Sequence, residues 1–185
     1  MGSIAASIGQ SARSAIACRY LFVTLVFGAL AHVACAAPVI GGVCVPDSYA
    51  IKKGIYETAG FGVRMDAKNV GSVRLLCPLD QDLATDLGQI AGMWMTYIDS
   101  DGMKTGGRVR ATLRRAARGT NVAESVGTCD SDTSDATGPT EIFCPLPKPV
   151  DLSDKYQWWW EVVIDRTDPA VNVEFLGLVS GYVTP

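Results

Sequence analysis

The near absence of histidine limits the chemistry of this chain more than any other feature of its sequence. The single histidine among 185 residues is His32, which lies in an N-terminal segment that we expect to be removed. Without histidine the chain has no Ser-His-Asp or Cys-His nucleophile and no histidine metal site. The phosphate-binding pattern G-x-x-x-x-G-K-[ST] and the dinucleotide-binding pattern G-x-G-x-x-G are also missing. We therefore predict no catalytic residue, no metal site and no cofactor.

Paired carboxylates are the catalytic chemistry that remains open to the chain. Glycoside hydrolysis needs two carboxyl groups about 5–9.5 Å apart. Glu161 and Asp165 share one face of a predicted strand, but four residues at about 3.3 Å each separate them by roughly 13 Å. Glu174, on the next predicted strand, is the residue that could complete such a pair. A carboxylate-dependent hydrolase is thus an alternative, although we favour acids that balance neighbouring arginines.

Three consecutive tryptophans, Trp158, Trp159 and Trp160, form the most unusual stretch of the sequence. Alternate side chains of a strand point to opposite faces, so Trp158 and Trp160 point together and Trp159 points away. We expect the first and third rings to fill the core, which leaves Trp159 on the outer face with Glu161. An exposed ring beside a carboxylate is suited to stacking on a sugar ring. Trp159 and Glu161 are therefore the predicted ligand-binding residues, with a loop contact or an oligomer interface as the alternatives for Trp159.

Two acidic segments, Asp99–Gly102 and Asp130–Asp132, resemble halves of a calcium-binding loop. Counted from Asp99, the glycine and the glutamate that an EF-hand requires at positions six and twelve are replaced by Lys104 and Arg110. The pattern therefore fails, and we interpret both segments as turns. Oxygen ligands gathered from the two segments stay an alternative.

Arginine recurs on one face of a predicted strand, at Arg108, Arg110 and Arg114, with Arg115 and Arg118 beyond it. Such a row could bind an anionic polymer, but we favour a row that faces water and cross-strand acids. Two of the 16 basic residues precede residue 37, so residues 37–185 carry 14 basic and 19 acidic residues and a net charge of −5. This charge argues against nucleic acid as a partner, because nucleic acid requires a basic surface.

Four cysteines follow the N-terminal segment: Cys44, Cys77, Cys129 and Cys144. An even number in an exported domain indicates disulfides, here two. Four cysteines allow three connectivities, among which the sequence does not decide. We favour the nearest-neighbour pairing, Cys44–Cys77 with Cys129–Cys144. A zinc site is disfavoured, because C-x-x-C pairs and histidines are both missing from this part of the sequence.

The first 36 residues have the three parts of a secretory signal peptide. They contain two arginines and no acidic residue, then an apolar run from Leu21 to Val33, and they end in Ala34-Cys35-Ala36. The run is too short for a membrane span, which takes roughly 20 residues. A membrane anchor and a lipid attached to Cys35 are the disfavoured alternatives. We predict a signal peptide at 1–36, a single secreted or periplasmic domain at 37–185 and no integral membrane segment after cleavage.

The remainder shows short apolar segments between turn signals, the pattern of an all-β domain. We expect residues 93–98 and 108–114 to pair as a hairpin, and 156–164 to pair with 173–182. A weaker pair of strands is expected at 50–57 and 60–65, and one helical turn at 80–89. The predicted fold is an antiparallel two-sheet sandwich with two disulfides, with jelly-roll-like and immunoglobulin-like topologies both open.

The sequence resembles a set of small secreted bacterial proteins of unassigned function. The resembling stretches are residues 44–48, 74–78, 99–102, 108–115, 128–131 and 156–167. The resemblance implies a β-sandwich and a bacterial exporter, and it brings no activity, ligand or catalytic residue.

Small size, the sandwich pattern, the lack of histidine and an outward Trp159 favour a non-enzymatic binding or surface-interaction module. A carbohydrate or another protein is the partner we expect, with glycan binding as the specific version. A structural protein that self-associates through its sheet edges or its tryptophans is the second hypothesis. The carboxylate-dependent hydrolase is the third.

Overall fold

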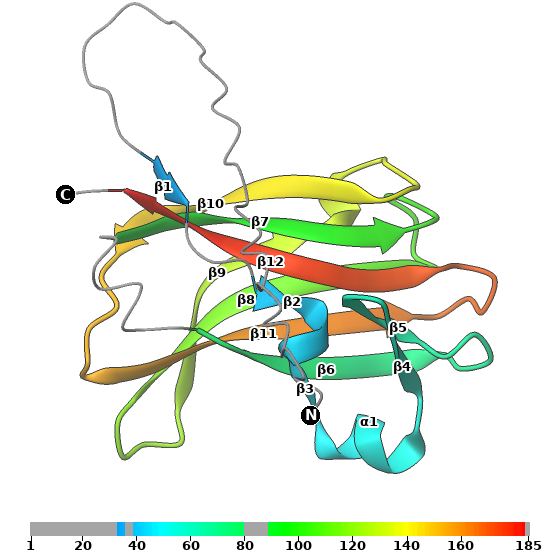
Figure 1. Cartoon of the computed structure of the whole chain (residues 1–185), viewed down its shortest axis with the longest axis horizontal. Coiled ribbons are helices and arrows are strands. Elements are labelled where there is room, and N and C mark those ends of the chain that lie inside the picture. The colour runs from blue at the N-terminus through cyan, green and yellow to red at the C-terminus, as the bar shows by residue number, and fades with distance from the viewer. Residues whose placement is uncertain (1–32, 36–38, 80–88, 184–185) are drawn as a thin grey trace, which may run out of the picture.

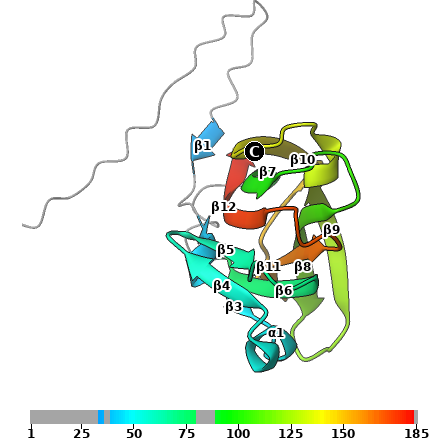
Figure 2. The same cartoon turned by 90° about the vertical axis from the view of Figure 1, so that its right-hand side faces the viewer.

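Two antiparallel β-sheets packed face to face form the protein (Figures 1 and 2). The computed structural model describes residues 33–35, 39–79 and 89–183. Within these residues one sheet has seven strands and the other has five. The predicted all-β sandwich is confirmed.

The seven-stranded sheet is built around three long neighbouring strands. Its path runs through β10 (Thr140–Val150), β7 (Gln89–Asp99), β12 (Val173–Val183), β5 (Gly62–Met65) and β4 (Tyr56–Ala59). Two short strands, β1 (Val33–Cys35) and β2 (Val39–Ile40), also pair with β12. β1 belongs to the predicted signal peptide, and the rest of that peptide lies outside the described residues.

The five-stranded sheet has β11 at its centre. Its order is β3 (Val45–Pro46), β6 (Gly71–Pro78), β11 (Tyr156–Arg166), β8 (Gly107–Ala117) and β9 (Ala123–Asp130). The sets β5-β12-β7-β10 and β6-β11-β8-β9 have the strand order of a jelly roll, in which the chain passes repeatedly between the two sheets. The structure thus decides between the two topologies that the sequence leaves open.

Every second residue of β11 points into the space between the sheets. Trp158, Trp160, Val162 and Ile164 are buried there, in one core with the inward residues of β7 and β8. Trp160 is 0 % exposed. Burial of a large apolar side chain stabilises the fold by about 1.5–3 kcal/mol. The prediction that Trp158 and Trp160 fill the core is confirmed.

Two predicted strand pairings are wrong. β7 and β8 lie in different sheets, and so do β11 and β12. β11 pairs instead with β6 and β8, and β12 pairs with β7. Alternation in the sequence shows which side chains point inward, but two strands with apolar inward faces can meet across the core as well as side by side.

The segment from residue 50 begins as a short helix, α1 (Ser48–Lys53), and not as the predicted strand. Asp47 caps this helix by accepting a hydrogen bond from the Ala50 amide at 2.7 Å, and Gly54 ends it with a φ of 59°. β4 and β5 then pair much as expected. No helix in the described ranges is long and apolar enough to cross a membrane. The helical turn predicted at 80–89 falls on residues 80–88, which are outside the described residues, and Gln89 begins β7.

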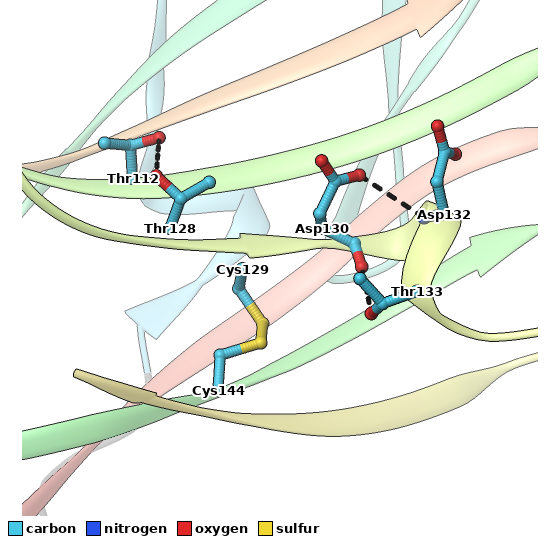
Figure 3. The surroundings of a disulfide bond; sticks show 7 residues. All are labelled: Thr112, Thr128, Cys129, Asp130, Asp132, Thr133 and Cys144. Carbon is cyan, nitrogen blue, oxygen red and sulfur yellow. Dashed lines mark hydrogen bonds between the residues drawn. A yellow bond between two sulfur atoms is a disulfide. The ribbon is translucent and has the colours of Figure 1, made fainter. Parts of the chain in front are cut away.

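Both disulfides join the partners that we favoured. Cys44–Cys77 connects the start of the domain to β6, and Cys129–Cys144 connects β9 to β10 (Figure 3). β9 and β10 are edge strands of different sheets, so Cys129–Cys144 ties the two sheets together along one side of the sandwich. Two disulfides are typical of a protein that matures in an oxidising, extracellular environment.

Replacing Cys129 and Cys144 by alanine should lower the free energy of unfolding by about 3 kcal/mol, because the bond spans a separation of 15 residues. The matching Cys44→Ala/Cys77→Ala variant should lose about 4 kcal/mol, because its bond spans 33 residues. Denaturant unfolding of the oxidised proteins measures both values. Equal stability of the wild type and the Cys129→Ala/Cys144→Ala variant would contradict the role of this bond in holding the sheets together.

Candidate functional site

Trp159 lies on the outer face of β11, as strand alternation predicts. Its ring is half-buried, whereas Trp158 and Trp160 on either side of it are buried. The residues next to it across the sheet are Arg114 of β8 and Pro78 of β6. The central strand therefore presents one tryptophan ring to the outside, beside an arginine.

Glu161, the second predicted ligand-binding residue, lies on the same face and contacts two arginines. Its Oε1 atom accepts hydrogen bonds from Arg114, with distances of 2.7 Å to Nη2 and 3.2 Å to Nε. Its Oε2 atom lies 3.7 Å from Nε of Arg74. The Glu161 side chain is only 14 % exposed. The carboxylate thus binds the guanidinium of Arg114, the cross-strand neighbour of Trp159.

The face continues along β11 from Trp159 through Glu161 and Val163 to Asp165. Six residues at about 3.3 Å each give it a length of roughly 20 Å. At the Asp165 end lies a groove of about 690 Å³. Most of its polar lining comes from Ser72, Thr105, Arg108, Asp132, Asp165 and Arg166. The outer face of β11 therefore runs from a half-buried ring to this groove.

Arg108 contacts two acids beside the groove. Its Nε atom donates to Asp130 at 2.9 and 3.1 Å and lies 3.4 Å from Asp132. The hydrogen bonds to Asp130 raise the pKa of Arg108, and burial raises the pKa of Asp132. Figure 3 shows Asp130 and Asp132 on the opposite side of β9 from the disulfide.

The predicted arginine row is only partly continuous. Arg108, Arg110 and Arg114 lie on the outer face of β8. Arg115 does not continue this row. Its Cζ atom lies 4.8 Å from the centre of the Tyr156 ring, and its side chain forms an ion pair with Glu124 at 2.8 Å. The expectation that arginines of this row face cross-strand acids is confirmed for Arg108 and Asp130.

The two acidic loops that resemble a calcium site come together in the fold. The Ser131 hydroxyl donates to Oδ2 of Asp99 at 2.6 Å, and Asp99 is 0 % exposed. Oδ1 of Asp99 has no hydrogen-bond partner, and burial raises the pKa of this carboxyl group to about 6. Among the residues that the structure describes, no three side chains of the types His, Cys, Asp and Glu form a group able to hold a metal ion.

The acids considered for hydrolysis do not converge. Glu174 lies in the seven-stranded sheet, whereas Glu161 and Asp165 lie four residues apart on β11 of the other sheet. Burial raises the pKa of Glu174, and the charge of its cross-strand neighbour Arg64 opposes that shift. The prediction that Glu174 lies on a strand next to Glu161 or Asp165 is therefore wrong.

Sequence reasoning missed a second aromatic surface, on the outer face of the seven-stranded sheet. The rings of Trp94 and Phe143 lie 4.5 Å apart, and Phe143 is 48 % exposed. Both rings lie over glycines, since a Cβ atom added to Gly181 would be 2.5 Å from Trp94 and one added to Gly92 would be 2.6 Å from Phe143. β7 pairs with both β10 and β12, and these pairings bring the four residues together. The sequence does not show which strands pair.

Comparison with known proteins adds little to this description. No family model and no curated protein matches the chain. Among solved structures, the chain is similar to one described as "Crystal Structure of Family 30 Carbohydrate Binding Module", with 15 % sequence identity and a TM-score of 0.43. The alignment covers 78 % of this chain and 94 % of that chain. Because the likeness is this distant, the function of the chain has to be argued from its own side chains.

The buried Asp99 predicts a specific pH dependence of stability. Because its pKa rises from 3.8 to about 6, the folded protein keeps this proton at pH values where the unfolded chain has lost it. The free energy of unfolding should therefore fall as the pH rises from about 4 to about 6, by up to roughly 3 kcal/mol, and this contribution should level off above that range. Denaturant unfolding across this range measures the effect.

Asp99→Asn is the variant that isolates this contribution, since an amide oxygen still accepts the Ser131 hydrogen bond without ionising. The difference in stability between wild type and variant should change between pH 4 and pH 6, that is, within the range set by the raised pKa of Asp99. Parallel pH profiles for the two proteins would show that Asp99 titrates normally.

Proposed function

We propose that the protein is a non-enzymatic carbohydrate-binding module, exported after removal of residues 1–36, and that the outer face of the five-stranded sheet binds the sugar. The observation that supports it best is the arrangement around Trp159. A half-buried indole ring lies on the central strand, beside an arginine that Glu161 holds in place at 2.7 Å.

A sugar ring has an apolar face and a rim of hydroxyl groups, and the surface around Trp159 offers a partner for each. The indole ring can stack on the apolar face. Arg114 and Arg74 donate hydrogen bonds, while Glu161 accepts them. Because its hydrogen bonds with Glu161 already orient Arg114, a ligand does not have to order this side chain, which favours binding.

The acids that the sequence suggested for hydrolysis form no catalytic pair among the described residues. Both oxygens of Glu161 face guanidinium groups, and Glu174 lies in the other sheet. Hydrolysis of a glycosidic bond needs one carboxylic acid that holds a proton and a second, ionised carboxylate opposite it. The export of residues 37–185 as one domain is supported by the two disulfides, which form in oxidising compartments.

Trp159→Ala should weaken polysaccharide binding tenfold or more, because burial of a large apolar side chain contributes about 1.5–3 kcal/mol. Trp94→Ala is the matched control, since Trp94 is also a half-buried outer-face tryptophan but lies in the opposite sheet. Affinity electrophoresis and tryptophan fluorescence, run with a panel of neutral and charged polysaccharides, measure the binding. The expected result is that Trp94→Ala binds like the wild type.

Three results would count against the proposal. Binding that survives Trp159→Ala and is lost in Trp94→Ala would move the site to the seven-stranded sheet. Failure of the wild type to bind any polysaccharide of the panel would remove the proposed function. If the wild-type protein also sediments as a dimer or larger oligomer at tens of micromolar, the result would support the self-association hypothesis instead.

A further inference from the structure

Three arginines lie on the outer face between Trp159 and the groove. Arg74 and Arg110 lie on either side of Val163, on β6 and β8, and Arg114 lies beside Trp159. We call Arg74, Arg110 and Arg114 the arginine zone. Arg74 is 58 % exposed, and the other two are half-buried. Ligands on this face therefore meet guanidinium groups from both neighbours of the central strand.

The three guanidinium groups of the arginine zone are not all held by ion pairs. Glu161 is the acid that contacts it, through Arg114 at 2.7 Å and Arg74 at 3.7 Å. Three arginines and one glutamate carry a net charge of +2 between them. Arg110 has neither a hydrogen bond nor an ion pair from its side chain to any described residue. The zone thus offers one guanidinium group, that of Arg110, without an ion-pair partner among the described residues.

Two other acids lie close to Arg110, but both face Arg108. Asp130 is the residue opposite Arg110 on β9, and its carboxylate accepts hydrogen bonds from Arg108 at 2.9 and 3.1 Å. Asp165 follows Val163 by two residues and lies opposite Arg108. These acids and Asp132 gather around Arg108. The charge of Arg110 also acts on Asp132, where it opposes the raised pKa of that acid. Arg110 therefore lies near acids but forms no ion pair with any of them.

A guanidinium group without an ion-pair partner is suited to bind an oxyanion. Its N–H groups form a fork that matches the two oxygens of a carboxylate, and sulfate oxygens fit the same donors. Neutral sugars offer only hydroxyl groups, which give Arg110 no ion-pair partner. We propose that the glycan carries carboxylate or sulfate groups, which the arginine zone binds while Trp159 stacks on a sugar ring. The inference rests on the proposed function and adds the chemical class of the ligand.

Two matched pairs of polymers test the inference, because each pair differs in charge and shares a backbone. Polygalacturonate is compared with its methyl ester, and dextran sulfate is compared with dextran. We expect the charged member of at least one pair to bind at least tenfold tighter than the neutral member. We also expect that preference to shrink as the salt concentration rises from about 0.01 M to 1 M, since salt screens exposed charges. The pair that shows the preference identifies the oxyanion as carboxylate or sulfate.

Arg110→Gln should reduce the affinity for the charged polymer about tenfold, and it should leave the affinity for the neutral polymer unchanged. Arg118→Gln is the matched control. It removes the same charge from an exposed site beyond the end of β8, where Arg118 contacts the Asp154 carbonyl at 2.6 Å. We expect the Arg118→Gln variant to bind both polymers like the wild type.

The outcomes separate this inference from the proposed function. Equal affinity for charged and neutral polymers, with Arg110→Gln unchanged and Trp159→Ala impaired, would overturn the inference and leave the carbohydrate-binding function standing. If Arg110→Gln and Arg118→Gln lose equal affinity for the charged polymer, the preference reflects general charge attraction. That result would also overturn the inference. If no polymer binds, both proposals fail.

Discussion

The burial of Trp158 and Trp160 between the two sheets determines the orientation of every residue on the proposed binding face. Both side chains lie in the core, and Trp160 is 0 % exposed. Because strand side chains alternate, this burial turns Trp159 and Glu161 outward. A shift of β11 by one residue would place Glu161 in the core, where an unpaired charge is strongly disfavoured. The packing of Trp158 and Trp160 in the core thus determines which side chains of β11 are available to a ligand.

Charge is distributed unevenly along this face. At one end Arg108 holds Asp130 and Asp132, and burial raises the pKa of Asp132. Towards Trp159, Glu161 contacts Arg114 and Arg74, while Arg110 beside Val163 forms no ion pair with a described residue. Exposed ion pairs contribute little to stability, on the order of 0–1 kcal/mol each. We therefore interpret the arrangement as a means of orienting side chains for a ligand, while the core and the disulfides stabilise the fold.

The parts of the fold that follow from local patterns could be predicted from the sequence. Alternation shows that Trp159 and Glu161 share the outer face, and the count of cysteines indicates two disulfides. Which strands are neighbours is a non-local property, and for this reason the pairings of β7 with β8 and of β11 with β12 were predicted wrongly. The contact between Trp94 and Phe143 depends on the pairing of β7 with β10, and the sequence contains no local signal for it.

The central claim is that the outer face of the five-stranded sheet binds a glycan. Chemical-shift mapping by NMR tests it most directly, with a soluble oligosaccharide of whichever polymer the protein binds. The account predicts that the largest shifts fall on the Trp159 indole N–H and on the amides of Glu161 and Arg114. Shifts confined to the residues around Trp94 and Phe143, with Trp159 unchanged, would contradict it.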